Sequence, residues 1–126
     1  MKKIVATNKA PAAIGPYSQA VQAGNFLFAS GQIPLDPETG QLVTGTIEEQ
    51  TKRVLDNVKA LLESAGYTMR DVVKTLVFAT SMDYFAPING VYAQYFPEEP
   101  PARSFVAAKE LPKGATLEIE VIAWKA

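Results

Sequence analysis

The chain has 126 residues, and none of them is cysteine or histidine. These two absences exclude a disulfide framework, a thiolate nucleophile, a zinc site built from cysteine and histidine, and a histidine general base. A metal ion could be held only by oxygen ligands. The segment LDPETG, residues 35–40, contains carboxylates, but their spacing fits no metal-binding loop. We interpret it as a surface turn.

Long apolar runs and clusters of one charge are also missing. The basic start, MKKIVATNKAPAAIGPY, lacks the apolar core of a signal peptide, and no stretch reaches the ~18 apolar residues of a membrane span. The net charge is −1 and there is no run rich in lysine or arginine, so nothing favours nucleic acid as a partner. We therefore expect a cytoplasmic protein that binds neither membranes nor nucleic acid.

What remains is the composition of an ordinary folded protein. Hydrophobic residues make up 48% of the sequence and charged residues 20%, which suits one core in a chain of this length. No repeat, low-complexity tract or internal linker divides the chain. We expect a single domain over residues 1–126.

A first helix is predicted at residues 47–65. Apolar residues recur there at the spacing of one helical face. Thr46 and Glu49 have the spacing of a capping box at the start, and Gly66 is a typical residue just after a helix.

A second helix is predicted at residues 83–96, with Asp83 as its cap. Pro87 is tolerable only because it lies near the start. The side chains expected to point inward are Phe85, Ile88, Tyr92 and either Tyr95 or Phe96.

Six further segments are predicted to be strands. The fourth is rich in apolar and β-branched residues and is expected to be a central strand buried on both faces. We expect the last two strands to form a hairpin. The order of elements predicts an α+β sheet with both helices on one face. The predicted strands are residues 2–6, 17–23, 25–34, 71–80, 102–108 and 115–124.

The other face of this sheet would be uncovered. In the last strand the apolar residues Leu117, Ile119, Val121 and Ala123 point one way, and Glu118 and Glu120 point the other. A face that mixes apolar and charged side chains is typical of a subunit interface. A homo-oligomer would close it.

Arg103 stands out because it lies in a strand that is otherwise suited to burial, PPARSFVAAK. One interpretation is a salt bridge across the predicted hairpin to Glu118 or Glu120. The other is that its guanidinium binds the carboxylate of a ligand, while a nearby glutamate holds or activates water. Taken alone, Tyr17, Ser30-Gly31 and Asn89 have ordinary structural explanations.

Six segments follow one another along the chain: APAAIGPYSQAV, ASGQIPLDPETG, QTKRVLDNVKALLESAG, VVKTLVFATSMDYFAPINGVYAQYF, PARS and LPKGATLEIEVIA. In order and spacing they resemble the RidA/YjgF family of reactive-intermediate deaminases. The resemblance covers nearly the whole chain, and PARS, LP and EIEVIA are its most specific parts. It implies a chorismate-mutase-like fold, with a six-stranded mixed sheet and two helices, assembled as a trimer around a central barrel. It also implies hydrolysis of 2-imino acids, such as 2-iminobutanoate and 2-iminopropanoate, in clefts between subunits, without metal or organic cofactor.

Carried over by position, Arg103 matches the family arginine that binds the substrate carboxylate, and Glu118 matches the residue that positions the attacking water. Phe105 stands where many members have cysteine. Its backbone could still contribute to the pocket and its bulk could change the substrate range, but a thiol-dependent role is excluded. Positions that line the family's pocket are matched by Tyr17, Ser30, Gly31 and Asn89.

Two other functions stay open at this point. One is an endoribonuclease or translation inhibitor, an activity attached to the family's name, although the lack of histidine and of a basic stripe does not favour it. The other is a regulatory trimer that binds 2-keto acids in the same cleft without catalysis.

Overall fold

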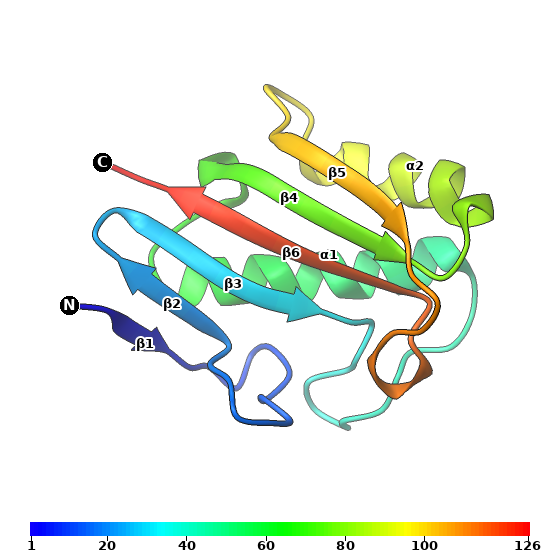
Figure 1. Ribbon diagram of the computed structural model, residues 1–126, viewed down its shortest axis with the longest axis horizontal. Coiled ribbons are helices and arrows are strands. Elements are labelled where there is room, and N and C mark those ends of the chain that lie inside the picture. The colour runs from blue at the N-terminus through cyan, green and yellow to red at the C-terminus, as the bar shows by residue number, and fades with distance from the viewer.

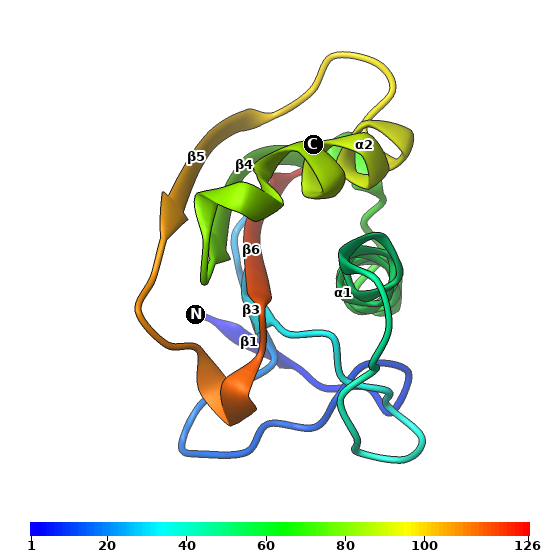
Figure 2. The same cartoon turned by 90° about the vertical axis from the view of Figure 1, so that its right-hand side faces the viewer.

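The structure, a computed structural model, describes residues 1–126 as one sheet with two helices packed on one of its faces (Figures 1 and 2). The strands lie side by side in the order β1-β2-β3-β6-β4-β5. This confirms the predicted six-stranded α+β sheet. The elements are β1 (Lys3–Val5), β2 (Ala20–Ala23), β3 (Phe26–Gln32), α1 (Ile47–Ser64), β4 (Val72–Ala79), α2 (Phe85–Tyr95), β5 (Ala102–Ala107) and β6 (Leu117–Trp124).

The predicted hairpin between the last two strands is wrong. β4 lies between them, pairing with β6 in the antiparallel and with β5 in the parallel direction. The reason is the crossover through α2, which returns the chain to the same end of β4 and so makes β5 its parallel neighbour. β5 is therefore an edge strand of the sheet (Figure 1).

Helix α1 lies within one residue of its predicted bounds. The side chain of Thr46 accepts a hydrogen bond from the backbone N–H of Glu49 at 3.1 Å. After Ser64 the chain turns away at Gly66, whose φ of 84° favours glycine. The apolar face of the helix packs against β3 and β6. The side chains that form it are buried: Val54, Leu55, Val58, Leu61 and Leu62.

Helix α2 begins two residues later than predicted. Ser81, not Asp83, supplies the cap: its side chain accepts a hydrogen bond from the backbone N–H of Asp83 at 3.0 Å and starts a short 3-10 turn before the helix. Ile88 and Tyr92 are buried as predicted. Phe85 is not, since 39% of it is exposed at the start of the helix. Neither α1 nor α2 is long and apolar enough to cross a membrane.

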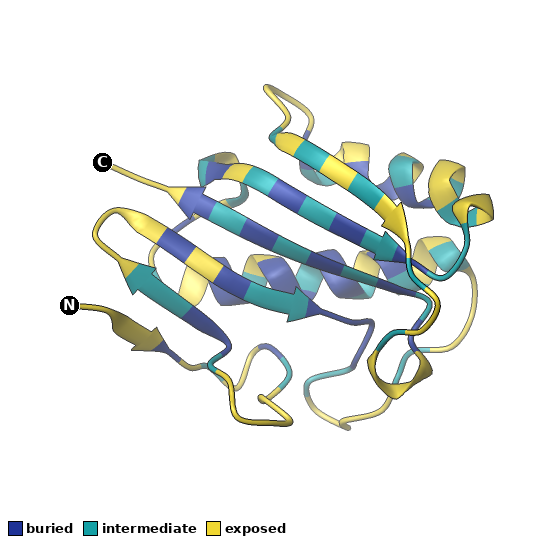
Figure 3. Cartoon of the chain, viewed as in Figure 1, coloured by how far each residue is buried: buried dark blue, intermediate teal, exposed yellow.

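The sheet face opposite the helices is uncovered in this chain, and β3, β4 and β6 show bands of alternating burial (Figure 3). The alternation predicted for β6 is confirmed, because its apolar set is buried against the helices. The prediction that β4 is buried on both faces is wrong. Leu76 and Phe78, which pair with Glu120 and Glu118 on the open face, are only partly buried.

The open face carries a row of apolar side chains across four strands. Ile4 pairs with Val21, Val21 with Phe28, and Phe28 with Ile122. Ile4 and Phe28 are 52% and 45% exposed. Such a row leaves much apolar surface in contact with water.

Candidate active site

Arg103 lies on the edge strand β5 and is half-buried on the helix side of the sheet. Arg103 pairs with Thr75 of β4, and Thr75 pairs with the buried Val121 of β6. Its Nη1 donates a hydrogen bond to Oδ1 of Asn89 at 2.7 Å. Arg103 and Asn89, two of the predicted site residues, are thus brought together.

Three aromatic rings surround the guanidinium of Arg103. Its central carbon lies 4.7 Å from the ring centroid of Tyr92, 5.4 Å from that of Phe105 and 5.7 Å from that of Phe85. The Phe85 and Phe105 rings lie 4.9 Å apart and tilted. These cation–π contacts help to hold the guanidinium in place, and its one hydrogen bond, to Asn89, leaves other donors of the fork for a ligand.

No carboxylate pairs with Arg103. The ion pairs in the structure join Lys52 to Asp56 and Arg70 to Glu98. The salt bridge to Glu118 or Glu120 considered above is therefore wrong, because β4 separates the strands that carry these residues. A guanidinium whose partners are all neutral retains its full charge for an incoming anion.

Sequence reasoning missed two of the side chains that support Arg103. Phe85 and Tyr92 were assigned to the core, yet both rings contact the guanidinium. The hydroxyl of Tyr92 is fixed by a hydrogen bond with Thr75 at 2.7 Å, and burial raises the pKa of this phenol. The signal in the sequence is the spacing of Phe85, Asn89 and Tyr92, which puts them on one face of a helix.

A second group of predicted residues gathers on the open face of the sheet. Glu118 lies at a depression of about 390 Å³ beside the N-terminal loop. Four of the predicted site residues line it, together with four that the sequence did not single out for a pocket. The lining residues are Ile14, Tyr17, Ser30, Gly31, Ile33, Pro112, Glu118 and Glu120.

The position of the Glu118 side chain leaves room only for glycine at residue 31. A Cβ atom added at Gly31 would lie only 2.7 Å from Cδ of Glu118, so any side chain there would displace the carboxylate. Next to it, Ser30 donates a hydrogen bond from its hydroxyl to the carbonyl of Ser18 at 2.7 Å. This pair of residues in β3 thus makes room for Glu118 and fixes the neighbouring loop.

The carboxylate of Glu118 forms no ion pair and no hydrogen bond within the chain. Burial raises the pKa of Glu118 above its usual range, and repulsion from Glu120 raises it further. A carboxylate with free oxygens and a raised pKa is a stronger base than an exposed one and suits proton transfer to and from water. No three acidic side chains gather where they could bind a metal ion.

One chain does not bring the two groups together. Arg103 lies on the face covered by the helices, whereas Glu118 lies on the open face, in register with Phe78 and Val106. Asn89 and Phe105 lie with Arg103, and the other predicted residues lie with Glu118. The predicted site is therefore two half-sites separated by the sheet.

The chain is similar to known proteins over almost its full length. The family model described as Endoribonuclease L-PSP matches residues 7–125. A RutC family protein from Pyrococcus horikoshii is 54% identical, over 99% of each chain. The 2-iminobutanoate/2-iminopropanoate deaminase of Escherichia coli K12 is 48% identical, over 98% of each chain.

Among solved structures, a protein from Thermotoga maritima, described as a candidate endoribonuclease, is 62% identical with a TM-score of 0.98; the match covers 100% of this chain and 99% of that one. These findings confirm the fold and the RidA/YjgF resemblance expected from the sequence. The chain belongs to the family described as Endoribonuclease L-PSP, which includes relatives named as imino acid deaminases.

Proposed function

We propose that this protein hydrolyses reactive 2-imino acids, such as 2-iminobutanoate and 2-iminopropanoate, to 2-keto acids and ammonia. The observation that carries the proposal is the setting of Arg103, whose charge is held by a neutral amide and aromatic rings and meets no carboxylate of its own chain. A small ligand with a carboxylate supplies the missing partner. The relative named as a deaminase of these two imino acids supports the choice of substrate.

The proposed site is completed by a second copy of the chain. Because the half-sites lie on opposite faces, Arg103 of one copy has to meet Glu118 of another. The apolar row on the open face favours such an assembly, since a neighbouring copy would remove it from water. Val106, on the edge strand, is 43% exposed and would become part of the contact. We propose a homotrimer with one site in each cleft.

In the proposed reaction, Arg103 binds the substrate carboxylate through two parallel hydrogen bonds and fixes the position of C2. Glu118 accepts a proton from water as the water oxygen bonds to C2 of the protonated imine, and the electron pair of the C=N bond moves to nitrogen. Glu118 then returns the proton to the amino group. The C2–N bond breaks, ammonia leaves, and the remaining hydroxyl loses its proton to water as the C2=O bond forms.

Phe105 contributes an aromatic wall where many family members have cysteine. With Phe85 it forms an apolar surface beside the guanidinium of Arg103. In the proposed site this surface faces the side chain of the substrate. The reaction does not use a thiol, so the replacement leaves hydrolysis possible.

The proposal is tested by trapping the imine. An amino-acid oxidase generates 2-iminopropanoate or 2-iminobutanoate, and semicarbazide traps whatever survives. Wild type, Arg103→Ala and Arg103→Lys are compared at equal concentration, with Arg70→Ala as the control. Arg70 is an exposed arginine that pairs only with Glu98, outside both half-sites. Wild type and the control should lower the trapped imine.

The two Arg103 variants should lose most of this activity, since lysine cannot form the two parallel hydrogen bonds. Near-normal turnover in Arg103→Lys would contradict the role given to Arg103. No turnover in folded wild-type protein would contradict the proposed reaction.

The name of the family favours endoribonuclease as a second candidate. A nuclease assay on the same proteins tests this candidate. RNA cleavage by wild type that is lost in Arg103→Ala would support an endoribonuclease over imine hydrolysis. Binding of a 2-keto acid by wild type without imine turnover would instead favour a regulatory trimer that uses the same cleft.

A further inference from the structure

We propose that Gln19 is a positioning residue that holds the loop of residues 11–18 against the Glu118 depression. Gln19 directly precedes β2, and only 6% of it is exposed. A buried glutamine has to satisfy both ends of its amide. Here every partner of that amide is a backbone group of residues 7–11, where the chain enters the loop.

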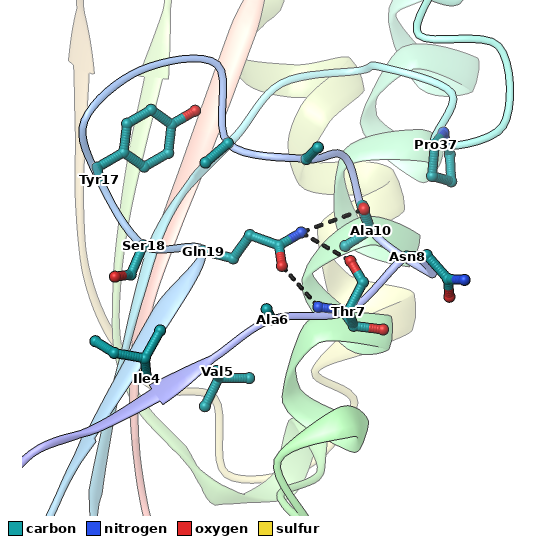
Figure 4. A pocket seen from close by; sticks show the side chains of 12 residues that line it. Ile4, Val5, Ala6, Thr7, Asn8, Ala10, Tyr17, Ser18, Gln19 and Pro37 are labelled. Carbon is teal, nitrogen blue, oxygen red and sulfur yellow. Dashed lines mark hydrogen bonds between the residues drawn. The ribbon is translucent and has the colours of Figure 1, made fainter.

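Both ends of the Gln19 amide are hydrogen-bonded to backbone groups. Its Oε1 accepts from the backbone N–H of Thr7 at 2.7 Å. Its Nε2 lies 3.0 Å from the carbonyl oxygen of Thr7, 3.3 Å from that of Ala10 and 2.7 Å from that of Pro11. Figure 4 shows the side chain reaching across a pocket toward Thr7 and Ala10. One side chain thus joins both ends of the loop.

The end of the loop is fixed a second time on β3. The backbone N–H of Ser30 donates to the carbonyl of Gln19 at 2.9 Å, and the Ser30 hydroxyl donates to the carbonyl of Ser18. Between these ties the loop carries Ile14 and Tyr17, which line the Glu118 depression. The Tyr17 hydroxyl accepts from the Ile14 N–H at 3.2 Å, so the two wall residues are also joined to each other.

Gln19 itself does not line the depression, so its effect on the reaction has to pass through the loop. Without the four hydrogen bonds of the Gln19 side chain, the loop would leave its position beside the Glu118 depression for part of the time. Ile14 and Tyr17 would then form the wall of the site in only a fraction of molecules. Substrate would bind that fraction, and the apparent affinity would fall in proportion. This expectation rests on the proposed function.

The test combines hydrogen exchange with kinetics. Gln19→Met keeps the length of the side chain and removes its hydrogen bonds. Gln22→Met is the control, because Gln22 lies on β2 and its amide only reaches the carbonyl of Gly24, at 3.5 Å. Backbone amide exchange is measured by peptide in the assembled protein, and KM and kcat are measured for imine hydrolysis.

We expect exchange over residues 7–18 to rise about tenfold or more in Gln19→Met, with β6 unchanged. KM should rise several-fold with kcat nearly constant, and Gln22→Met should match wild type in both measurements. Unchanged exchange in Gln19→Met would overturn the proposal. Faster exchange with unchanged KM would overturn the positioning role.

If Gln19→Met fails to fold, Gln19→Glu answers the same question. The ionised carboxylate faces three carbonyl oxygens and should release the loop, whereas the protonated form can donate again. Protection of residues 7–18 relative to wild type should therefore recover as the pH falls. Absence of this recovery would overturn the proposal. If wild type shows no imine turnover, the proposed function fails, while the exchange measurements still test the loop contact.

Discussion

Replacing Asn89 with aspartate tests whether Arg103 has to remain free of an internal counter-ion. Asn89 holds the guanidinium through a neutral amide, with Oδ1 and Nη1 2.7 Å apart. Asn89→Asp has the same shape and retains the hydrogen bond, but it adds a negative charge at that point. Arg103 would then be paired before substrate arrives. We expect KM for imine hydrolysis to rise with a much smaller change in kcat.

The size of the effect follows from the distance. Two unit charges about 4 Å apart attract each other by about 4 kcal/mol at an effective dielectric constant of about 20. Arg103 and Asn89 are only partly buried, so solvent and salt reduce this attraction to about 1–2 kcal/mol. The substrate carboxylate would face a site weakened by that amount, which corresponds to a fall in kcat/KM of about 5- to 30-fold.

The assay is imine hydrolysis at low and high ionic strength. Gln94→Glu is the matched control, because Gln94 is exposed on α2 and the substitution adds the same charge away from Arg103. The loss in Asn89→Asp should shrink as salt screens the added charge. A kcat/KM for Asn89→Asp equal to that of Gln94→Glu would refute the idea that the free charge of Arg103 binds the substrate.

Two further predictions concern Glu118. Burial and repulsion from Glu120 both raise the pKa of Glu118, so Glu120→Gln should lower this pKa. The acidic limb of the pH profile of kcat/KM, where Glu118 becomes protonated, should then move to lower pH while the neutral plateau stays unchanged. An unmoved limb would contradict the role of Glu118 as the base. In Gly31→Ala the new methyl group should displace the Glu118 carboxylate and reduce kcat at least about tenfold, with little loss of thermal stability. A kcat near that of wild type would show that the position of this carboxylate does not matter.

Local patterns in the sequence predicted the local structure well. Helix α1 follows from its cap at Thr46, its apolar spacing and Gly66, all of which act over a few residues. The exposed position of Phe85 could not be predicted in this way. Its apolar side chain reads as core, yet it contacts the guanidinium of Arg103, a partner 18 residues away along the chain.

The sequence singled out the candidate site residues, but it did not predict how they are arranged. Ser30, Gly31 and Tyr17 do lie around Glu118, and Asn89 does contact Arg103. The prediction that Arg103 and Glu118 lie close together was wrong, because it assumed that strands adjacent in the sequence are adjacent in the sheet. The α2 crossover places β4 between them, and only the strand order reveals this.

The central claim is that each site takes Arg103 from one copy and Glu118 from another, and subunit mixing tests it most directly. Arg103→Ala and Glu118→Gln are each expected to be inactive as pure assemblies. Co-expressed with different tags and purified as mixed trimers, they should recover activity, because some clefts receive both intact residues. Each mixed trimer has one cleft with both intact residues, so about one third of the wild-type activity per trimer is expected. Mixed trimers as inactive as their parents would contradict the account.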